Sequence, residues 1–230
     1  MMNKFAVIGM GQFGVAIARN LAKEGAEVMA IDNNPDRIEL IKDEVAHAVT
    51  LDATDQRVLE AQNIQEMDAV VVAIGEDFEA LLMTTVQLME LRVERIIARA
   101  ANTQQRMILE KLGIKDILSP EEEVGRTLAK TLLNPNIKSF LPLPDGYEIV
   151  EINTPKKIAD KSVREIDLRR KYNINLITIK RLFEENKDGQ TVEIEHIIGV
   201  PRPDTILYET DILIVLGKSK DVDKFVHLNV

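Results

Sequence analysis

The sequence predicts an α/β domain built on a doubly wound parallel sheet, followed by a smaller α+β module. Short apolar runs alternate with amphipathic helical segments across residues 4–118, the pattern of a parallel sheet covered by helices. A glycine-rich turn joins the first apolar run to the first helical segment. After residue 146 the pattern changes to strands separated by one helix and by hairpin turns, which is typical of an α+β module.

The glycine-rich turn follows the first predicted strand, Phe5 to Ile8. Gly9, Gly11 and Gly14 have G-x-G-x-x-G spacing. The first glycine allows a tight turn, the second lets backbone amides approach a phosphate, and the third lets the next helix pack on the strand. That helix has an apolar stripe formed by Phe13, Ile17 and Leu21. Its free amides would face the anion.

The second predicted strand, Glu27 to Ile31, ends on Asp32, where an acid can accept hydrogen bonds from ribose hydroxyls. Strand, glycines, helix, second strand and acid all agree, so we favour a nucleotide site over a plain structural turn. Asn33 and Asn34 follow the acid, and no cation comes before Arg37. A 2′-phosphate needs a nearby cation, so a free ribose is favoured, as in NAD(H), ATP, ADP or AMP.

The alternation continues through the rest of the first domain. Further strands are expected at residues 47–51, 69–74, 95–100 and 115–118. Helices are expected at residues 35–43, 78–91 and 103–112. A further short helix is expected to follow strand three and to end at about residue 61. The run 69–74 is continuously apolar, as in a strand buried on both faces. Together these elements describe a Rossmann-type sheet with strand order 3-2-1-4-5-6.

Several candidate ligand contacts lie where these strands end, at the edge of the sheet where ligands bind in open α/β folds. Asp52 ends strand three, where it could face the adenine or cap a helix. Ile74 and Gly75 close strand four. Arg99 ends strand five, where it could neutralise a phosphate or be solvated.

The helix expected at residues 78–91 is apolar around most of its circumference, whereas a helix that only covers a sheet keeps a polar outer face. We therefore expect it to form an assembly interface; burial by later segments of the same chain is the alternative. The expected interface residues are Leu81, Leu82, Met83, Val86, Leu88 and Met89.

Another helix begins after Ser119-Pro120 with three acids, Glu121 to Glu123. Acids in a first turn complement the helix dipole, and coordination of a cation by Glu121 beside a nucleotide is the second interpretation. The proline- and glycine-containing segment 141–146 predicts a linker. We therefore expect a nucleotide-binding domain over residues 1–140 and an α+β module over residues 141–230.

Composition restricts the function. The net charge is −9, aromatic residues make up 4% and tryptophan is absent, so nucleic acid is not expected as a partner. Cysteine is absent, which excludes disulfides and thiolate sites. No apolar run approaches the length of about 20 residues needed to span a bilayer, and no signal-peptide pattern begins the chain, so a cytoplasmic location is expected.

The motifs of hydride transfer and hydrolysis are missing. The three histidines, His47, His196 and His227, do not fall at crevice positions, and the sequence has no H-E-x-x-H, no G-x-S-x-G and no Walker lysine. We therefore expect that the protein is not an enzyme and that it senses the nucleotide without consuming it. The alternative is a small NAD-dependent oxidoreductase completed by dimerisation.

The motifs together resemble those of the RCK (regulator of K⁺ conductance) gating subunits of Ktr and Trk potassium transporters. The resemblance rests in the first domain on V-I-G-M-G-Q-F-G, V-M-A-I-D-N-N, L-D-A-T-D, V-V-V-A-I-G, I-I-A-R-A and L-S-P-E. In the second module it rests on V-R-E-I-D-L-R-R-K-Y, N-L-I-T-I, a proline loop and T-D-I-L-I-V-L-G. It covers nearly the whole chain.

This resemblance implies a cytoplasmic regulator at the inner face of the membrane. Its copies would form dimers and an octameric ring beneath a membrane-embedded K⁺ (or Na⁺) transporter subunit, and ATP, ADP or NAD(H) would change the shape of the ring. The residues implied to bind the nucleotide are Gly9, Gly11, Gln12, Phe13, Gly14, Asp32, Asn33, Asn34, Asp52, Ala53, Ile74, Gly75 and Arg99.

The resemblance also implies two further sites, and this chain differs from the family pattern at one position. Glu121 matches a family acid that can hold a cation at a subunit interface. Some relatives bind cyclic di-AMP between two C-terminal modules, and the corresponding positions here are Ile166, Asp167, Arg169 and Asn175. Relatives that distinguish ATP from ADP often carry arginine where this chain has Gln12, which leaves ADP or NAD(H) open as ligands.

Overall fold

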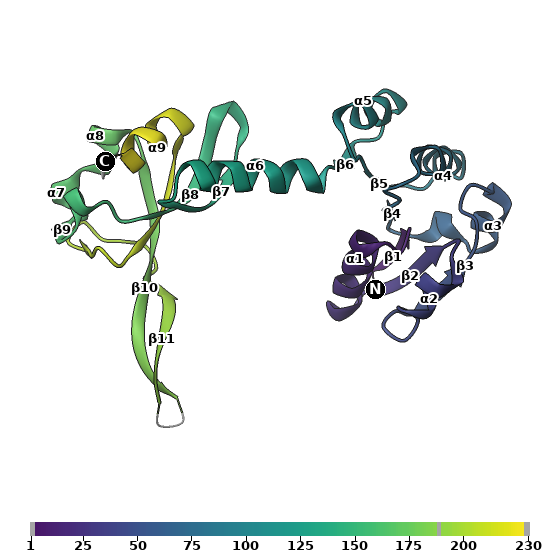
Figure 1. Cartoon of the computed structure of the whole chain (residues 1–230), viewed down its shortest axis with the longest axis horizontal. Coiled ribbons are helices and arrows are strands. Elements are labelled where there is room, and N and C mark those ends of the chain that lie inside the picture. The colour runs from purple at the N-terminus through teal and green to yellow at the C-terminus, as the bar shows by residue number, and fades with distance from the viewer. Residues whose placement is uncertain (1–2, 188–189, 228–230) are drawn as a thin grey trace. The chain divides into compact units, whose positions relative to one another are not determined.

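The computed structural model describes residues 3–187 and 190–227 (Figure 1). The chain forms two compact units, Met1–Glu123 and Val124–Val230. Each unit has its own hydrophobic core.

The first unit contains a six-stranded parallel sheet in the order β3-β2-β1-β4-β5-β6, which confirms the predicted Rossmann-type topology. Its strands are β1 (Lys4–Ile8), β2 (Glu27–Asp32), β3 (His47–Thr50), β4 (Ala69–Val72), β5 (Ile96–Arg99) and β6 (Asp116–Leu118). Its helices are α1 (Gln12–Lys23), α2 (Pro35–Glu39), α3 (Gln56–Ala61), the short η1 (Ile64–Glu66), α4 (Phe78–Glu90) and α5 (Thr103–Leu112).

Alternate side chains of the central strands enter two cores, one on each face of the sheet. On β1, Ile8 joins the core that contains residues of α3, α4 and α5, whereas Val7 joins the core that contains residues of α1 and α2. All four residues of β4 are buried, as predicted for a strand covered on both faces.

Helix α4 buries two of the six residues that the sequence assigns to an assembly interface. Leu81 and Leu88 are buried in the core of their own unit, so their expected role in assembly is wrong. Met83 and Met89 are exposed, and Leu82 and Val86 are half-buried. The helix therefore has an inner apolar face and a second, outward one, and its sequence alone does not separate them.

The second unit contains a five-stranded antiparallel sheet in the order β11-β10-β13-β8-β7. Its strands are β7 (Ile137–Pro142), β8 (Tyr147–Asn153), β10 (Asn175–Lys187), β11 (Gln190–Ile197) and β13 (Ile212–Lys218), and the short strands β9 (Lys161–Ser162) and β12 (Ile206–Leu207) pair separately. Its helices are α7 (Val163–Ile166), α8 (Leu168–Tyr172) and α9 (Ser219–Val226), with short turns η2 (Pro144–Gly146) and η3 (Lys156–Ile158). Strands β10 and β11 form a long hairpin (Figure 1).

Residues 141–146 are not the linker that the sequence predicts. Leu141 and Pro142 end β7 and pair with β8, and η2 makes the turn between these two strands. Proline is tolerated there because β7 is an edge strand of its sheet. Helix α6 (Pro120–Leu133) contains the division between the units, which falls after Glu123, whereas the sequence places a boundary after residue 140.

Candidate functional site

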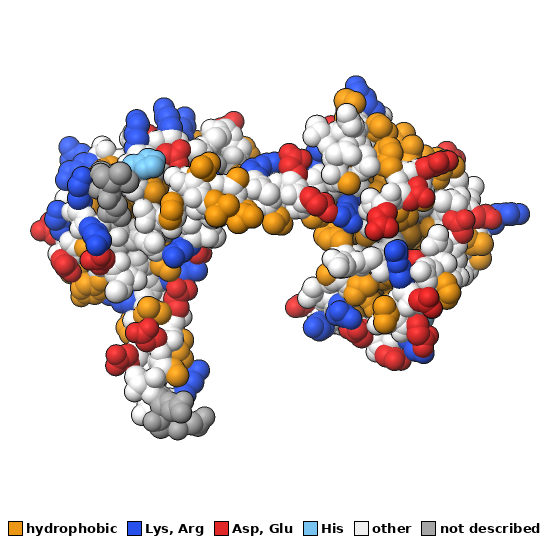
Figure 2. Space-filling view, in the orientation of Figure 1, with side chains coloured by type: hydrophobic (Ala, Val, Ile, Leu, Met, Phe, Trp, Pro, Cys, Tyr) orange, Lys and Arg blue, Asp and Glu red, His pale blue; other side chains and the backbone are white. Residues whose placement is uncertain are grey.

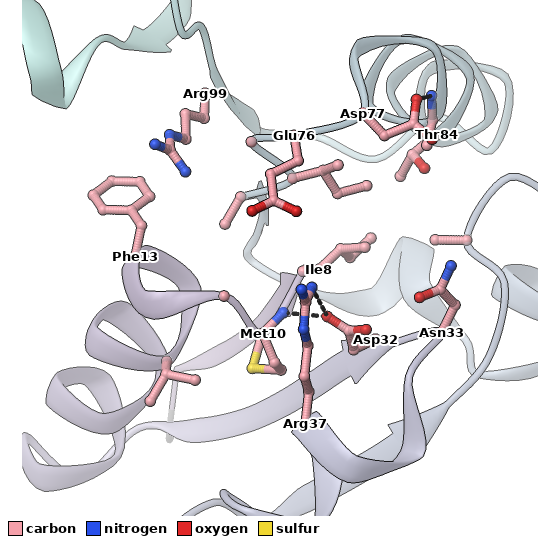
Figure 3. Close-up of a pocket in the computed structure, with 18 of the residues that line it drawn as sticks. Ile8, Met10, Phe13, Asp32, Asn33, Arg37, Glu76, Asp77, Thr84 and Arg99 are labelled. Atoms are coloured by element: carbon pink, nitrogen blue, oxygen red, sulfur yellow. Dashed lines mark hydrogen bonds and ion pairs between the residues drawn. The ribbon is translucent and has the colours of Figure 1, made fainter.

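A hollow of about 1280 Å³ lies in the first unit, where the glycine-rich turn meets the ends of β2, β4 and β5 (Figure 3). Its size suits a mononucleotide or a dinucleotide. Twelve of the residues predicted to contact a ligand or cation line it: Gly9, Gly11, Gln12, Phe13, Asp32, Asn33, Asp52, Ala53, Ile74, Gly75, Arg99 and Glu121.

The three glycines of the turn have different physical reasons to be glycine. Gly9 has a φ of +97°, which side chains with a Cβ rarely adopt. A Cβ on Gly14 would lie 1.9 Å from the carbonyl oxygen of Gly9. Gly11 has extended backbone, with φ −73° and ψ −177°, and a Cβ there would meet nothing within 4 Å. The fold therefore requires Gly9 and Gly14, whereas it does not require glycine at position 11, which lines the hollow and has open space beside it.

Gly11 is also the residue that precedes α1, and no side-chain hydrogen bond caps this helix. The first amides of a helix have no partners inside the helix, and they carry its positive dipole end. An anion bound beside Gly11 would satisfy them.

Asp32 is 5% exposed and ties the turn to the end of β2. One carboxylate oxygen accepts a hydrogen bond from the Met10 amide at 2.6 Å, and the other accepts one from the Asn34 amide at 2.8 Å. Each carboxylate oxygen can accept a further hydrogen bond. Asp32 can therefore hold the protein backbone and receive ribose hydroxyls at the same time.

Arg37 is a site residue that the sequence analysis missed. Its Nη1 lies 3.6 Å from Oδ2 of Asp32, and both residues line the hollow (Figure 3). The distance along the chain disfavoured a cation near the ribose, but α2 begins directly after Asn34 and brings Arg37 back over the end of β2. The proline at the helix start and the asparagine cap were the signals that could have revealed this return.

Two residues assigned to ligand binding, Asn34 and Gly14, have structural roles, and neither lines the hollow. The Asn34 side chain accepts a hydrogen bond from the Asp36 amide and caps α2. Gly14 provides the close packing of α1 against the turn. The local fold therefore accounts for asparagine at position 34 and glycine at position 14.

Asp52 lies in the hollow and does not cap a helix. Its Oδ1 accepts hydrogen bonds from the Thr54 amide at 3.0 Å and from the Thr54 hydroxyl at 2.7 Å. The cap of α3 is Asp55, whose side chain accepts from the Arg57 amide. The capping interpretation of Asp52 is therefore wrong, and its carboxylate is available beside Ala53 at the edge of the hollow.

Arg99 is held in place and is not the solvated arginine that was the alternative. Its side chain is 19% exposed, its guanidinium carbon lies 5.3 Å from the centre of the Phe13 ring, and it pairs with Glu121. A Cβ on Gly75 would lie 2.4 Å from Nη1 of Arg99, so the guanidinium lies directly beside this glycine and would have to shift if a side chain replaced it.

Glu121 stands in the first turn of α6. The pKa of its carboxyl is lowered from the ordinary value, first by a hydrogen bond from its own backbone amide and also by Arg99, while partial burial acts in the opposite direction. The described residues contain no group of three histidine or acidic side chains that could hold a metal ion. A cation at Glu121 would need ligands beyond these, such as a nucleotide phosphate.

The hollow contains further residues that the sequence analysis did not single out. They are Arg19, Leu40, Glu76, Asp77, Ala80 and Thr84, among others. Figure 3 shows Glu76 extending between the Arg99 side and the Asp32 side of the site. Thr84 Oγ1 and Arg99 Nε are buried and make no hydrogen bond within the described part of the chain. Buried polar atoms usually have partners, and both of these residues line the hollow.

The TrkA-N domain family matches residues 5–120, and the TrkA-C domain family matches residues 147–228. The "Ktr system potassium uptake protein C" of Bacillus subtilis (strain 168) is 35% identical over 225 residues, which cover 98% of this chain and 96% of that protein. The two chains therefore share both units.

Solved structures agree on the fold. The structure titled "Crystal Structure of the GsuK RCK domain" is 23% identical with a TM-score of 0.53, over 99% of this chain and 46% of that one. The structure titled "GsuK channel bound to NAD" is 14% identical with a TM-score of 0.64, over 100% of this chain and 40% of that one. The chain thus spans less than half the length of these GsuK chains. No described helix has both the length and the apolar character required to cross a bilayer.

Proposed function

Because the chain belongs to the RCK family of Ktr and Trk potassium uptake regulatory subunits, we propose that it binds an adenine nucleotide in the first-unit hollow and regulates a membrane-embedded K⁺ transporter. The observation that best supports binding is Gly11, since nothing in the fold requires glycine there and the space beside it lies next to the uncapped start of α1. The occupant would be ADP, ATP or NAD(H).

Each part of the nucleotide has matching groups in the hollow. The amides near Gly11 and the Arg99 guanidinium would bind phosphate, and Asp32 would accept hydrogen bonds from the ribose hydroxyls. Asp52 and Ala53 lie on the side proposed for the adenine. Arg37, beside Asp32, would offset part of the negative charge that the carboxylates of the hollow, Glu76 among them, add to the site.

Regulation would follow from assembly into a ring that has two shapes. A ligand shifts such an equilibrium only if it binds the two shapes with different affinities, and a difference of a few kcal/mol is enough. The outward residues of α4 and the exposed stripe of α6 are the proposed contacts between copies. The α6 stripe consists of Val124, Leu128 and Leu132, and Figure 2 shows hydrophobic side chains along this helix.

We also propose a second nucleotide site, which lies in the C-terminal unit and would bind cyclic di-AMP. Arg169 Nε donates to Asn175 Oδ1 at 2.7 Å, so two of the four candidate residues lie together. Ile166 is 3% exposed in the core of its unit and would support the site from behind. Titration with cyclic di-AMP tests this proposal, and an Arg169→Ala variant that bound it as tightly as the unchanged chain would contradict it.

The central experiment is a calorimetric panel of ATP, ADP, AMP, NAD⁺, NADH and NADPH on the purified chain, followed by K⁺ flux into vesicles that contain a Ktr-type membrane subunit. We expect adenine nucleotides to bind and to change the flux when this chain is present. If none of them binds, the proposal is wrong.

The competing function, a small NAD-dependent oxidoreductase, is tested by incubating the chain with NADH and a panel of carbonyl metabolites. Steady oxidation of NADH with any of them would favour the enzyme. The names of the curated relatives support the regulator, since they describe potassium uptake proteins.

A further inference from the structure

The Arg99–Glu121 pair joins two residues that differ in how freely they can move. The guanidinium of Arg99 lies over the Phe13 ring and beside Gly75. Its side chain is 19% exposed, whereas that of Glu121 is 56% exposed. Glu121 can turn into water at little cost, whereas Arg99 is mostly buried against the residues that line the hollow.

The guanidinium of Arg99 lies beside the start of α1. Phe13 is the second residue of that helix, and the guanidinium carbon is 5.3 Å from its ring centre (Figure 3). A phosphate bound by the first amides of α1 would therefore approach the same guanidinium that Glu121 now occupies. The two anions would compete for one cation.

We propose that Glu121 acts as a built-in competitor of the ligand phosphate for Arg99. This inference rests on the proposed nucleotide binding and adds a specificity determinant to it. A nucleoside has no phosphate, so its affinity does not depend on the Arg99 cation. A nucleotide must displace the Glu121 carboxylate before its phosphate can pair with Arg99. Glu121 therefore lowers the affinity for phosphate-bearing ligands and leaves adenosine binding unchanged.

The exchange acts on the first turn of α6, because Glu121 is the second residue of that helix. The displaced carboxylate stays near the helix N-terminus, where the dipole still favours an acid. Nucleotide phosphate thus changes the contacts of a helix that continues to Leu133 in the second unit.

The test compares the binding of adenosine, AMP and ADP to the unchanged chain, to Glu121→Gln and to Glu122→Gln by calorimetry. Glu122→Gln is the matched control, since it removes the same charge from the same helical turn at a position that does not line the hollow. We expect Glu121→Gln to bind ADP about two- to fivefold more tightly, the range for an exposed ion pair, with adenosine unaffected. In the background of Arg99→Ala, the same substitution should have no effect on ADP affinity.

Three results would overturn this inference and leave the proposed function standing. ADP affinity unchanged in Glu121→Gln would exclude competition, and an equal gain in Glu122→Gln would assign the effect to general charge. If Glu121→Gln still tightened ADP binding in the Arg99→Ala background, the effect would not depend on the Arg99 cation. Failure of the unchanged chain to bind any nucleotide would overturn the proposed function together with this inference, so the two failures are distinguishable.

Discussion

A Cβ placed on Gly14 would lie 1.9 Å from the carbonyl oxygen of Gly9, whereas one placed on Gly11 would meet nothing within 4 Å. Two glycines three residues apart in one motif are thus glycine for different physical reasons. Gly14 serves the packing of α1 on the turn, and Gly11 leaves open the space proposed for phosphate.

The first prediction follows from this contrast. Gly11→Ala should change the free energy of unfolding by less than about 1 kcal/mol, because its backbone is extended and only the cap preference changes. It should weaken ADP binding by about tenfold or more, because the methyl group fills the space for the phosphate. Urea unfolding and calorimetry measure the two quantities.

Gly14→Ala is the matched comparison. It should destabilise the fold by more than about 2 kcal/mol, because the turn must shift to admit the methyl group. Equal stability of the two variants would contradict the assignment of roles, as would unchanged ADP affinity in a folded Gly11→Ala variant.

The second prediction concerns the neighbouring threonines of α4. Thr84 Oγ1 is buried and makes no hydrogen bond within the described residues, whereas Thr85 Oγ1 donates to the Leu81 carbonyl at 2.7 Å. Thr84→Val removes a buried polar atom that lacks a partner, so the ligand-free chain should become more stable by about 1 kcal/mol. Thermal unfolding measures the change.

Thr85→Val is the control for the same loss of a hydroxyl on the same helix. It breaks a hydrogen bond, so it should leave stability equal or lower. A Thr84→Val variant less stable than Thr85→Val would show that the Thr84 hydroxyl has a partner in solution, such as water.

The third prediction concerns Asp32, which holds two backbone amides as well as the proposed ribose. Asp32→Ala leaves the Met10 amide without its acceptor in a buried position, so it should lower the free energy of unfolding by about 1–3 kcal/mol and weaken nucleotide binding. Asp52→Ala should have a smaller effect on stability, because its bonds are confined to Thr54. Nucleotide affinity that is unchanged in a folded Asp32→Ala variant would exclude Asp32 as the ribose ligand.

The fourth prediction concerns an ion pair in the second unit. Asp211 is 1% exposed and accepts two hydrogen bonds of 2.7 Å from Arg181, and these bonds raise the pKa of the arginine. Asp211→Ala should cost about 3–5 kcal/mol, because a mostly buried cation loses its partner. Glu209→Ala breaks the exposed pair with Lys156 and should cost less than about 1 kcal/mol. Similar losses in the two variants, measured by urea unfolding, would contradict the difference in burial.

The fifth prediction is the pH dependence of the Arg99–Glu121 pair. The pKa of Glu121 is lowered on folding, so the stabilisation from its charged form is present above the ordinary value of 4.5 and is lost as the pH falls through the lowered value. The ratio of ADP affinities between Glu121→Gln and the unchanged chain should therefore be constant from about pH 6 to 8. A ratio that varied across this range would mean that the carboxyl titrates near neutrality.

The sequence by itself determined the order of elements, the six-stranded topology and the glycine turn, because periodicity and turn chemistry are local properties that decide which faces are buried. It did not determine what covers each face. Leu81 and Leu88 enter their own core, Arg37 returns to Asp32, Arg99 lies between Phe13 and Glu121, and Leu141 pairs in an edge strand. Each of these is a contact between residues that only the packed chain brings together, so the tertiary structure alone decided them.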